Sequence, residues 1–166
     1  LKDAEPTVEV RVNGFLSSCT GNCSFFHTEE DTPEVTALSA SDSGLLTITG
    51  TNLAENTNNV DVKIGEMDCE TLTASLTEVT CQLEGGPTGT HPLTLVVKNK
   101  GLARQPTPLS HTVTLTILSS SPEAGSVGGG TPITVTGTGF PGTMEAWQGG
   151  SVSLGGVPCT VTETSY

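Results

Sequence analysis

Two blocks of this sequence occur twice in the same order, and this duplication constrains the fold more than any other feature. The block Leu46-Thr-Ile-Thr-Gly-Thr-Asn-Leu53 returns 87 positions later as Ile133-Thr-Val-Thr-Gly-Thr-Gly-Phe140. The block Val62-Lys-Ile-Gly-Glu-Met-Asp-Cys69 returns 90 positions later as Val152-Ser-Leu-Gly-Gly-Val-Pro-Cys159. A repeat of this length approaches the ~100 residues of a small sandwich domain. The sequence therefore predicts tandem copies of one β-domain.

The residues within these blocks indicate an all-β protein. Ile133 and Val135 alternate with threonines, which is the pattern of a half-buried strand. Gly137 and Gly139 then end that strand in a turn, and Phe140 follows as a bulky anchor. The 166 residues include 20 Gly and 10 Pro, a composition that suits short strands and suffices for one or two domains.

The first complete domain is expected at residues 32–117. Seven short strands separated by turn residues fit a β-sandwich. The predicted strands are residues 34–39, 45–51, 59–64, 67–73, 77–83, 92–98 and 109–117.

A second domain is expected at residues 118–166, with almost no linker before it. Its opening, Leu118-Ser-Ser-Ser-Pro122, parallels Leu38-Ser-Ala-Ser-Asp42. Alignment with the first domain places Tyr166 before the equivalents of residues 77–117, so we expect only the N-terminal half of this domain. Such a half sandwich leaves a sheet edge and an apolar face uncovered. The chain is then cut short, or the missing strands are disordered or supplied by a neighbour.

Residues 1–31 lie outside the repeat. Val8, Val10 and Val12 alternate with charged residues as in a strand, and Asn13-Gly14 is a hairpin turn signal. We interpret this region as the end of a preceding module followed by a connector with a Cys-x₃-Cys pattern. The start at Leu1, without a signal peptide, indicates a fragment or a processed piece.

The charge balance excludes several partner classes. Six Lys and Arg against 18 Asp and Glu give a formal charge of −12. Nucleic acid requires a basic face, and anionic lipid head groups attract one, so we expect no nucleic acid and no direct membrane contact. Five cysteines in a β-rich chain favour an oxidising compartment.

The later block resembles a known domain family. The run from Ser121-Pro122 through Gly128-Gly-Gly130, the strand ending at Phe140 and the hairpin ending at Cys159 are similar to the immunoglobulin-like domain shared by plexins and transcription factors (IPT/TIG). Residues 32–117 match this pattern less well. The connector before Thr32-Pro33 resembles the ectodomains of the fibrocystin family. The resemblance implies tandem early-set immunoglobulin sandwiches.

The same resemblance implies a function. In fibrocystin-like proteins such domains fill a long extracellular region on a single transmembrane anchor, at cilia and other surface protrusions. We therefore expect an extracellular structural and interaction module whose neighbours are further IPT/TIG domains of the same chain. A protein or glycan partner stays unidentified, and no cofactor is expected.

The cysteine spacing predicts two disulfides. Cys69 and Cys81 fall on or beside neighbouring predicted strands, where a bridge stabilises the domain by roughly 3 kcal/mol on the chain-entropy model. Cys19 and Cys23 can close a tighter loop, although zinc on Cys19, Cys23 and His27 is an alternative that requires reduced thiols and a fourth ligand. Cys159 aligns with Cys69, so its partner would fall at position 171, and we expect it to be unpaired.

Three further features have a candidate functional role. Asn22-Cys23-Ser24 matches the N-glycosylation sequon. The acidic run Glu29-Glu30-Asp31 offers oxygens to calcium, or it is a solvated connector. Trp147 is either an exposed contact for a partner or sugar, or a plug for the end of its own sandwich.

Other functional classes have less support. A carbohydrate-binding domain would present exposed aromatic side chains, and only Trp147, Tyr166 and four Phe are available. A Rel-like DNA-binding domain is disfavoured by the charge. His91 and His111 have no partners that form a catalytic set, so the sequence does not indicate an enzyme.

Overall fold

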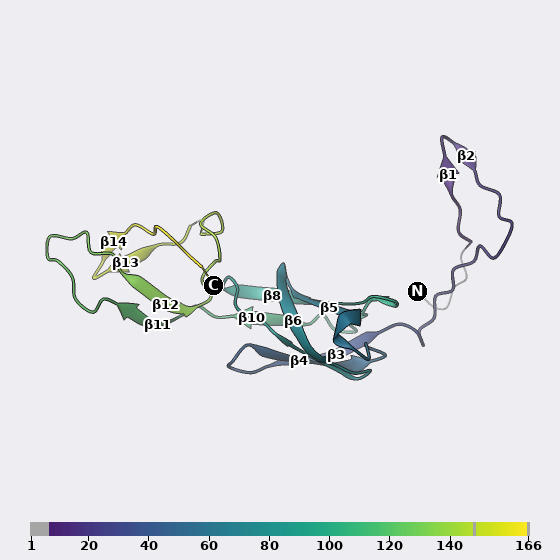
Figure 1. Cartoon of the computed structure of the whole chain (residues 1–166), viewed down its shortest axis with the longest axis horizontal. Coiled ribbons are helices and arrows are strands. Elements are labelled where there is room, and N and C mark those ends of the chain that lie inside the picture. Colours follow the sequence, from purple (N-terminus) through teal and green to yellow (C-terminus); the bar gives the residue numbers. More distant parts are fainter. Residues whose placement is uncertain (1–6, 148, 166) are drawn as a thin grey trace.

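The computed structural model describes residues 7–147 and 149–165. Three parts follow one another along the long axis of the molecule (Figure 1): an N-terminal arm (residues 7–31), a first unit (residues 34–113) and a second unit (residues 116–165). Tyr166 lies outside the described residues.

The described residues form an all-β structure, and their only helix is the short 3₁₀ turn η1 (Thr57–Asn59). The strands are β1 (Arg11–Val12), β2 (Phe15–Leu16), β3 (Glu34–Ala40), β4 (Leu45–Thr51), β5 (Val60–Ile64), β6 (Met67–Ala74), β7 (Glu78–Gln82), β8 (Gly89–Val97), β9 (Gly101–Leu102), β10 (Ser110–Val113), β11 (Thr116–Ser121), β12 (Thr134–Thr138), β13 (Val152–Leu154) and β14 (Val157–Cys159).

The arm contains the predicted hairpin. Val12 lies opposite Phe15, so Asn13 and Gly14 form a two-residue turn between β1 and β2. Both residues have positive φ, 50° and 85°, as a type I′ turn requires. The side chains on both strands of this hairpin are exposed.

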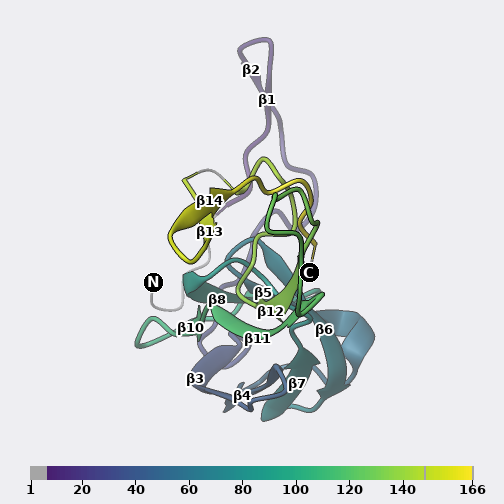
Figure 2. The same ribbon diagram turned by 90° about the vertical axis from the view of Figure 1, so that its left-hand side faces the viewer.

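The first unit is a sandwich whose strands form one continuous antiparallel ladder, in the order β10-β8-β5-β6-β7-β4-β3, with β9 also paired to β8. Strand β6 belongs to both layers, because Met67–Cys69 pairs with β5 and the residues from Glu70 onward pair with β7. Figure 2 shows β3, β4 and β7 in one layer, below β5 and β8. The start of β3 closes one corner, where Glu34 forms a parallel bridge with Arg104.

The core of the first unit follows from strand alternation. In β4, Leu46 and Ile48 are completely buried while Thr47 and Thr49 face outward. The facing layer buries alternate residues of β5 and β8 in the same way. The core cluster contains Val35, Leu46, Ile48, Leu53, Ala54, Val60, Val62, Ile64, Cys69, Val79, Cys81, Leu83, Leu93, Leu95, Val97 and Ala103.

The prediction of one strand over residues 109–117 is wrong. Strand β10 ends at Val113 after pairing with β8, and β11 begins at Thr116 in a new pair with β12. The apolar alternation of Val113, Leu115 and Ile117 continues through the break, which is why the sequence pattern hides it. At this break the carbonyls of Val113 and Thr114 accept hydrogen bonds from the side-chain hydroxyls of Thr88 and Thr138.

The second unit consists of the hairpins β11–β12 and β13–β14. Strand β12 begins at Thr134, so Ile133 precedes it rather than opening it, and the Ile133 side chain is 41% exposed. Val135 is half-buried while Thr134 and Thr136 are exposed, which agrees with the predicted strand phase. Gly137 lies within the strand, and the turn follows at Gly139.

We expect matched substitutions in the two units to differ in their effect. Ile48→Ala removes a fully buried side chain and should lower the free energy of unfolding by about 2–4 kcal/mol. Val135→Ala, at the equivalent position of the second unit, should lower it by less than about 1 kcal/mol because Val135 is half-buried. Urea unfolding followed by circular dichroism measures both, and equal losses would mean that β12 is buried as β4 is.

Candidate functional site

The bridge between Cys69 and Cys81 lies where the two layers of the first unit meet. Cys69 is the last residue of β6 that pairs with β5, and Cys81 lies in β7 with its side chain in the core. The two form a disulfide with a Cα separation of 5.5 Å. The bond therefore fastens the strand shared by the layers to the strand that follows it.

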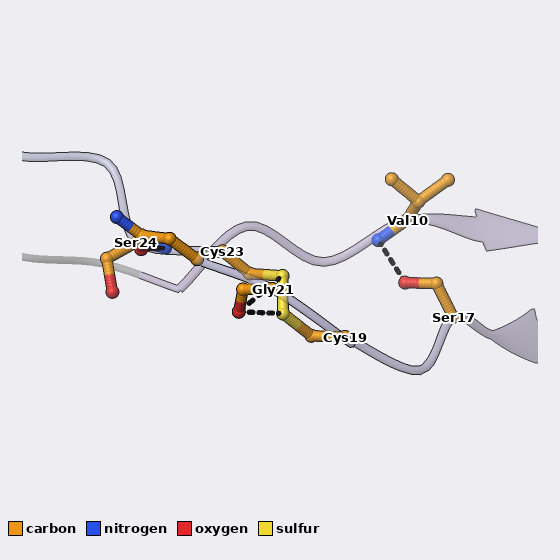
Figure 3. The surroundings of a disulfide bond; sticks show 7 residues. Val10, Ser17, Cys19, Gly21, Cys23 and Ser24 are labelled. Atoms are coloured by element: carbon orange, nitrogen blue, oxygen red, sulfur yellow. Dashed lines mark hydrogen bonds between the residues drawn. A yellow bond between two sulfur atoms is a disulfide. The ribbon is translucent and has the colours of Figure 1, made fainter.

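The bridge between Cys19 and Cys23 closes a tight loop in the arm. Figure 3 shows Gly21 within this loop, with its carbonyl toward the sulfur atoms. The backbone N–H of Val8 donates to the carbonyl of Cys23, so the loop is also tied to the segment that precedes β1. Because both thiols are bonded to each other, neither is free to bind zinc together with His27.

The sequon lies beside this disulfide on the exposed surface of the arm. The side chain of Asn22 is exposed, and its Oδ1 accepts a hydrogen bond from the backbone N–H of Ser24 at 3.0 Å. This geometry leaves the amide nitrogen of Asn22 accessible for modification.

The acidic connector is tied to the first unit. Arg104 hydrogen-bonds Glu34 through Nε at 2.9 Å and forms an ion pair with Glu29 at 3.6 Å. The hydrogen bond and charge of Glu34 raise the pKa of Arg104. Asn52 adds a link by donating to the backbone carbonyl of Glu30 at 2.8 Å. The Glu29 side chain stays 63% exposed in this ion pair, so the pairing does not contradict the interpretation of a solvated connector.

Calcium at this connector receives no support from the geometry. Asp31 accepts a hydrogen bond from the hydroxyl of Thr28, which closes a local turn. Within residues 7–147 and 149–165, no three His, Cys, Asp or Glu side chains are close enough together to hold a metal ion.

The first unit carries an exposed ion pair between Lys63 and Asp68. Lys63 and Asp68 lie opposite each other in β5 and β6, with Nζ 2.9 Å from the carboxylate. The hydrogen bond from Lys63 to Asp68, together with the charge of Asp68, raises the pKa of Lys63. Both side chains are solvated, so the pair contributes little to stability.

Trp147 packs within the second unit. Its ring is half-buried and stacks on Phe140, with the ring centroids 6.3 Å apart at an interplanar angle of 27°. Gly150 passes close beneath the indole, where a Cβ would lie 2.8 Å from Cε2. The plug and contact roles both stay predictions, and this packing favours the plug.

The joint between the two units contains hydrogen bonds that sequence reasoning missed, and one of them, from Thr88 to Gly139, joins the units directly. The backbone N–H of Thr88, just before β8, donates to the carbonyl of Gly139 at 2.9 Å, and its hydroxyl donates to Val113 at 3.0 Å. The hydroxyl of Thr138 donates to the carbonyl of Thr114 at 3.2 Å. No sequence pattern marks Thr88 as a joint residue, because its hydrogen-bond partners depend on how the two units are arranged.

Gly139 is required at this joint by both its backbone and its surroundings. Its φ of +81° lies in the left-handed region, and a Cβ there would lie 2.6 Å from the carbonyl oxygen of Thr114. The sequence predicted a turn at Gly139 but not its place in the joint; Asn52, its counterpart in the first unit, also has positive φ.

Cys159 is an exposed free thiol at the end of β14. It lies opposite Val152 in the hairpin β13–β14, as Cys69 lies opposite Val62 in the first unit. The two cysteines are therefore equivalent in structure as well as in sequence, although only Cys69 is bridged.

Comparison with known domains agrees with this repeated arrangement. The model of the IPT/TIG domain matches residues 33–111 and again residues 115–166. The chain belongs to the IPT/TIG domain family. IPT/TIG domains are non-catalytic modules with an immunoglobulin-like fold, and this chain carries them in tandem.

Individual relatives containing such IPT/TIG units are much longer than this chain. It is 31% identical over 166 residues to fibrocystin-L of Mus musculus and 31% identical over 174 residues to fibrocystin-L of Homo sapiens, in each case over 96% of this chain and 4% of the relative. It is 34% identical over 100 residues to fibrocystin of Mus musculus, which covers 58% of this chain and 2% of that protein. The chain thus spans about 4% of the length of its fibrocystin-L relatives.

Alkylation of the unreduced protein should label one thiol only, on Cys159. The other four cysteines are held in the two bridges and cannot react. Mass spectrometry of the intact protein, followed by peptide mapping, counts and locates the label. Three labels, or a bridge from Cys159 to an earlier cysteine, would contradict the pairing and the equivalence of Cys159 with Cys69.

Proposed function

We propose that this chain is part of the extracellular region of a large cell-surface protein, where serial IPT/TIG units act as stiff spacers and present surfaces to partners. The joint at Thr88 and Gly139 is the observation that carries this proposal. Only two residues separate β10 from β11, and a direct hydrogen bond from Thr88 to Gly139 connects the first unit to the second. A connection of this kind opposes the free rotation that a flexible linker permits.

The extracellular setting rests on the disulfides and on the relatives. Stable disulfides form in oxidising compartments, and this chain holds two. Its similarity to fibrocystin and fibrocystin-L supports the same setting. Location on cilia or similar protrusions is the finer part of the proposal, and the family resemblance alone supports it. Among the described residues no helix is long and apolar enough to cross a membrane.

The charge supports protein or glycan partners over nucleic acid or anionic lipid. With a formal charge of −12, the chain lacks the basic face that either polyanion requires. We therefore propose neighbouring IPT/TIG units of the same chain as its constant partners. A carbohydrate-binding role would need exposed aromatic faces, and the half-buried Trp147 offers only part of its ring.

The stiffness of the joint can be measured with two spin labels. One label goes on Cys159 and the other on a Ser39→Cys substitution in the exposed part of β3. Pulsed electron resonance should give one narrow distance distribution. Thr88→Pro removes the N–H that donates to Gly139 and should broaden that distribution.

Thr88→Val is the matched control for this experiment, because it keeps the N–H and removes only the hydroxyl. It should leave the distribution nearly as narrow as in the unchanged chain. A broad distribution in the unchanged chain, or no difference between the Pro and Val variants, would contradict the stiff joint.

We also propose that Asn22 carries an N-linked glycan. The sequon lies on an exposed part of the arm, and secretion would bring it to the glycosylation machinery. Protein secreted from eukaryotic cells should lose mass on treatment with an N-glycosidase. Asn22→Gln and Ser24→Ala should each abolish that loss, and an unchanged mass before and after treatment of the parent chain would refute the site.

A further inference from the structure

The loop between β9 and β10 presents a threonine between two prolines. Its sequence is Gln105-Pro-Thr-Pro-Leu109, and Thr107 is the only residue of the chain with a proline on both sides. Pro106, Thr107 and Pro108 are all exposed and lie outside the two strands. The threonine is therefore displayed on the surface of the first unit.

The two prolines keep this segment out of the sheet. Neither has a backbone N–H, so neither can donate a hydrogen bond to a neighbouring strand. Pro108 also disfavours a helical conformation for Thr107, which precedes it, and favours an extended one. The segment is thus a short stretch of extended chain whose backbone is not committed to a strand ladder.

The loop is anchored on both sides of the prolines. The buried Ala103 donates its N–H to the carbonyl of Leu95 at 2.9 Å, and the N–H of Leu93 donates to the carbonyl of Leu109 at 2.9 Å. The Gln105 side chain joins the two ends, because its Nε2 donates to the carbonyl of Leu93 at 2.8 Å and its Oε1 accepts from the N–H of Leu109 at 2.9 Å. The proline segment is therefore held out from a fixed base.

The other serine and threonine residues that precede a proline have a different setting. Thr32 and Thr131 are half-buried, and their hydroxyls form hydrogen bonds with the backbone. Ser121 is exposed but lies in β11, where it is paired with Thr134. Of these four positions, Thr107 alone is both exposed and outside a strand.

We propose that Thr107 is an attachment site for an O-linked N-acetylgalactosamine. Serine and threonine in proline-containing, exposed chain are typical acceptors of mucin-type glycans. A transferase needs an accessible acceptor segment, and the exposed, extended chain around Thr107 provides one. The proposal rests on the extracellular setting proposed above, because this modification is made in the secretory pathway.

The reaction needs one co-reactant, the nucleotide sugar uridine diphosphate N-acetylgalactosamine. The hydroxyl oxygen of Thr107 forms a bond to the anomeric carbon of the sugar, and the bond from that carbon to the diphosphate breaks. The hydroxyl proton passes to the departing uridine diphosphate. One bond forms and one breaks, so no oxidant or reductant takes part.

The whole chain, secreted from cultured human cells, tests the site. The cells lack the galactosyltransferase that extends the first sugar, so each glycan of this class stays a single N-acetylgalactosamine. Treatment with an N-glycosidase first removes any glycan on Asn22. The remaining mass should exceed that of the polypeptide by an N-acetylhexosamine, and electron-transfer fragmentation should place this sugar on Thr107.

The design separates failure of the site from failure of the proposed function. A secretion signal attached to the chain sends it through the secretory pathway, whatever the location of its parent protein. An unmodified Thr107 would then count against the site and not against the extracellular setting.

Three variants test the sequence requirement. Thr107→Ala should lose the sugar that maps to this loop. Thr77→Ala is the matched control, because Thr77 is also an exposed threonine in a bend between two strands but has no neighbouring proline, and it should keep the sugar on Thr107. Replacing Pro106 and Pro108 together by alanine keeps the acceptor hydroxyl and should lower the occupancy of Thr107 several-fold.

Three results would overturn the proposal. The first is an unmodified Thr107 in the secreted chain. The second is equal occupancy of Thr107 in the parent chain and in the double proline variant. The third is a hexose on Thr107 in place of the N-acetylhexosamine, because a transferase of another class would then modify this residue.

Discussion

The pairing of β7 with both β4 and β6 is the interaction on which the rest of the structure depends. It connects the two layers through the strand that they share, and it places Val79 and Cys81 in the core. The disulfide to Cys69 fastens the same contact covalently. Where the described chain lacks a strand of this kind, in the second unit, the same apolar positions are exposed and the equivalent cysteine is free.

Much of this arrangement could be predicted from the sequence because it is local. Alternation located most strands of the first unit, and Asn13-Gly14 predicted a turn whose two φ angles are positive. Features that depend on contacts distant in sequence were missed. The joint at Thr88 has no local pattern, and the apolar alternation from Val113 to Ile117 concealed the change of partner strand between β10 and β11. The sequence alignment of Leu118 with Leu38 was wrong by two residues, because the strand register, in which Leu118 and Thr36 both lie at a shift, depends on pairing with the next strand.

The proposed role follows from how the parts are joined and from the charge they carry. Arg104 ties the arm to the first unit, and Thr88 ties the first unit to the second, so both junctions are made by direct polar contacts. A strongly acidic surface keeps such a series of domains soluble and apart from polyanions. These properties suit a spacer that presents surfaces at a distance, which agrees with the similarity to the much longer fibrocystin-L proteins.

The account rests on one claim. The hairpins β3–β4 and β11–β12 share a strand register, but among the described residues only β4 has a partner strand on both edges. Native hydrogen exchange measured along the chain tests this claim most directly. Amides of β4, which has a partner on both sides, should exchange at least about 100-fold more slowly than those of β12, which has a partner on one side. Equal protection of β4 and β12 would contradict the account.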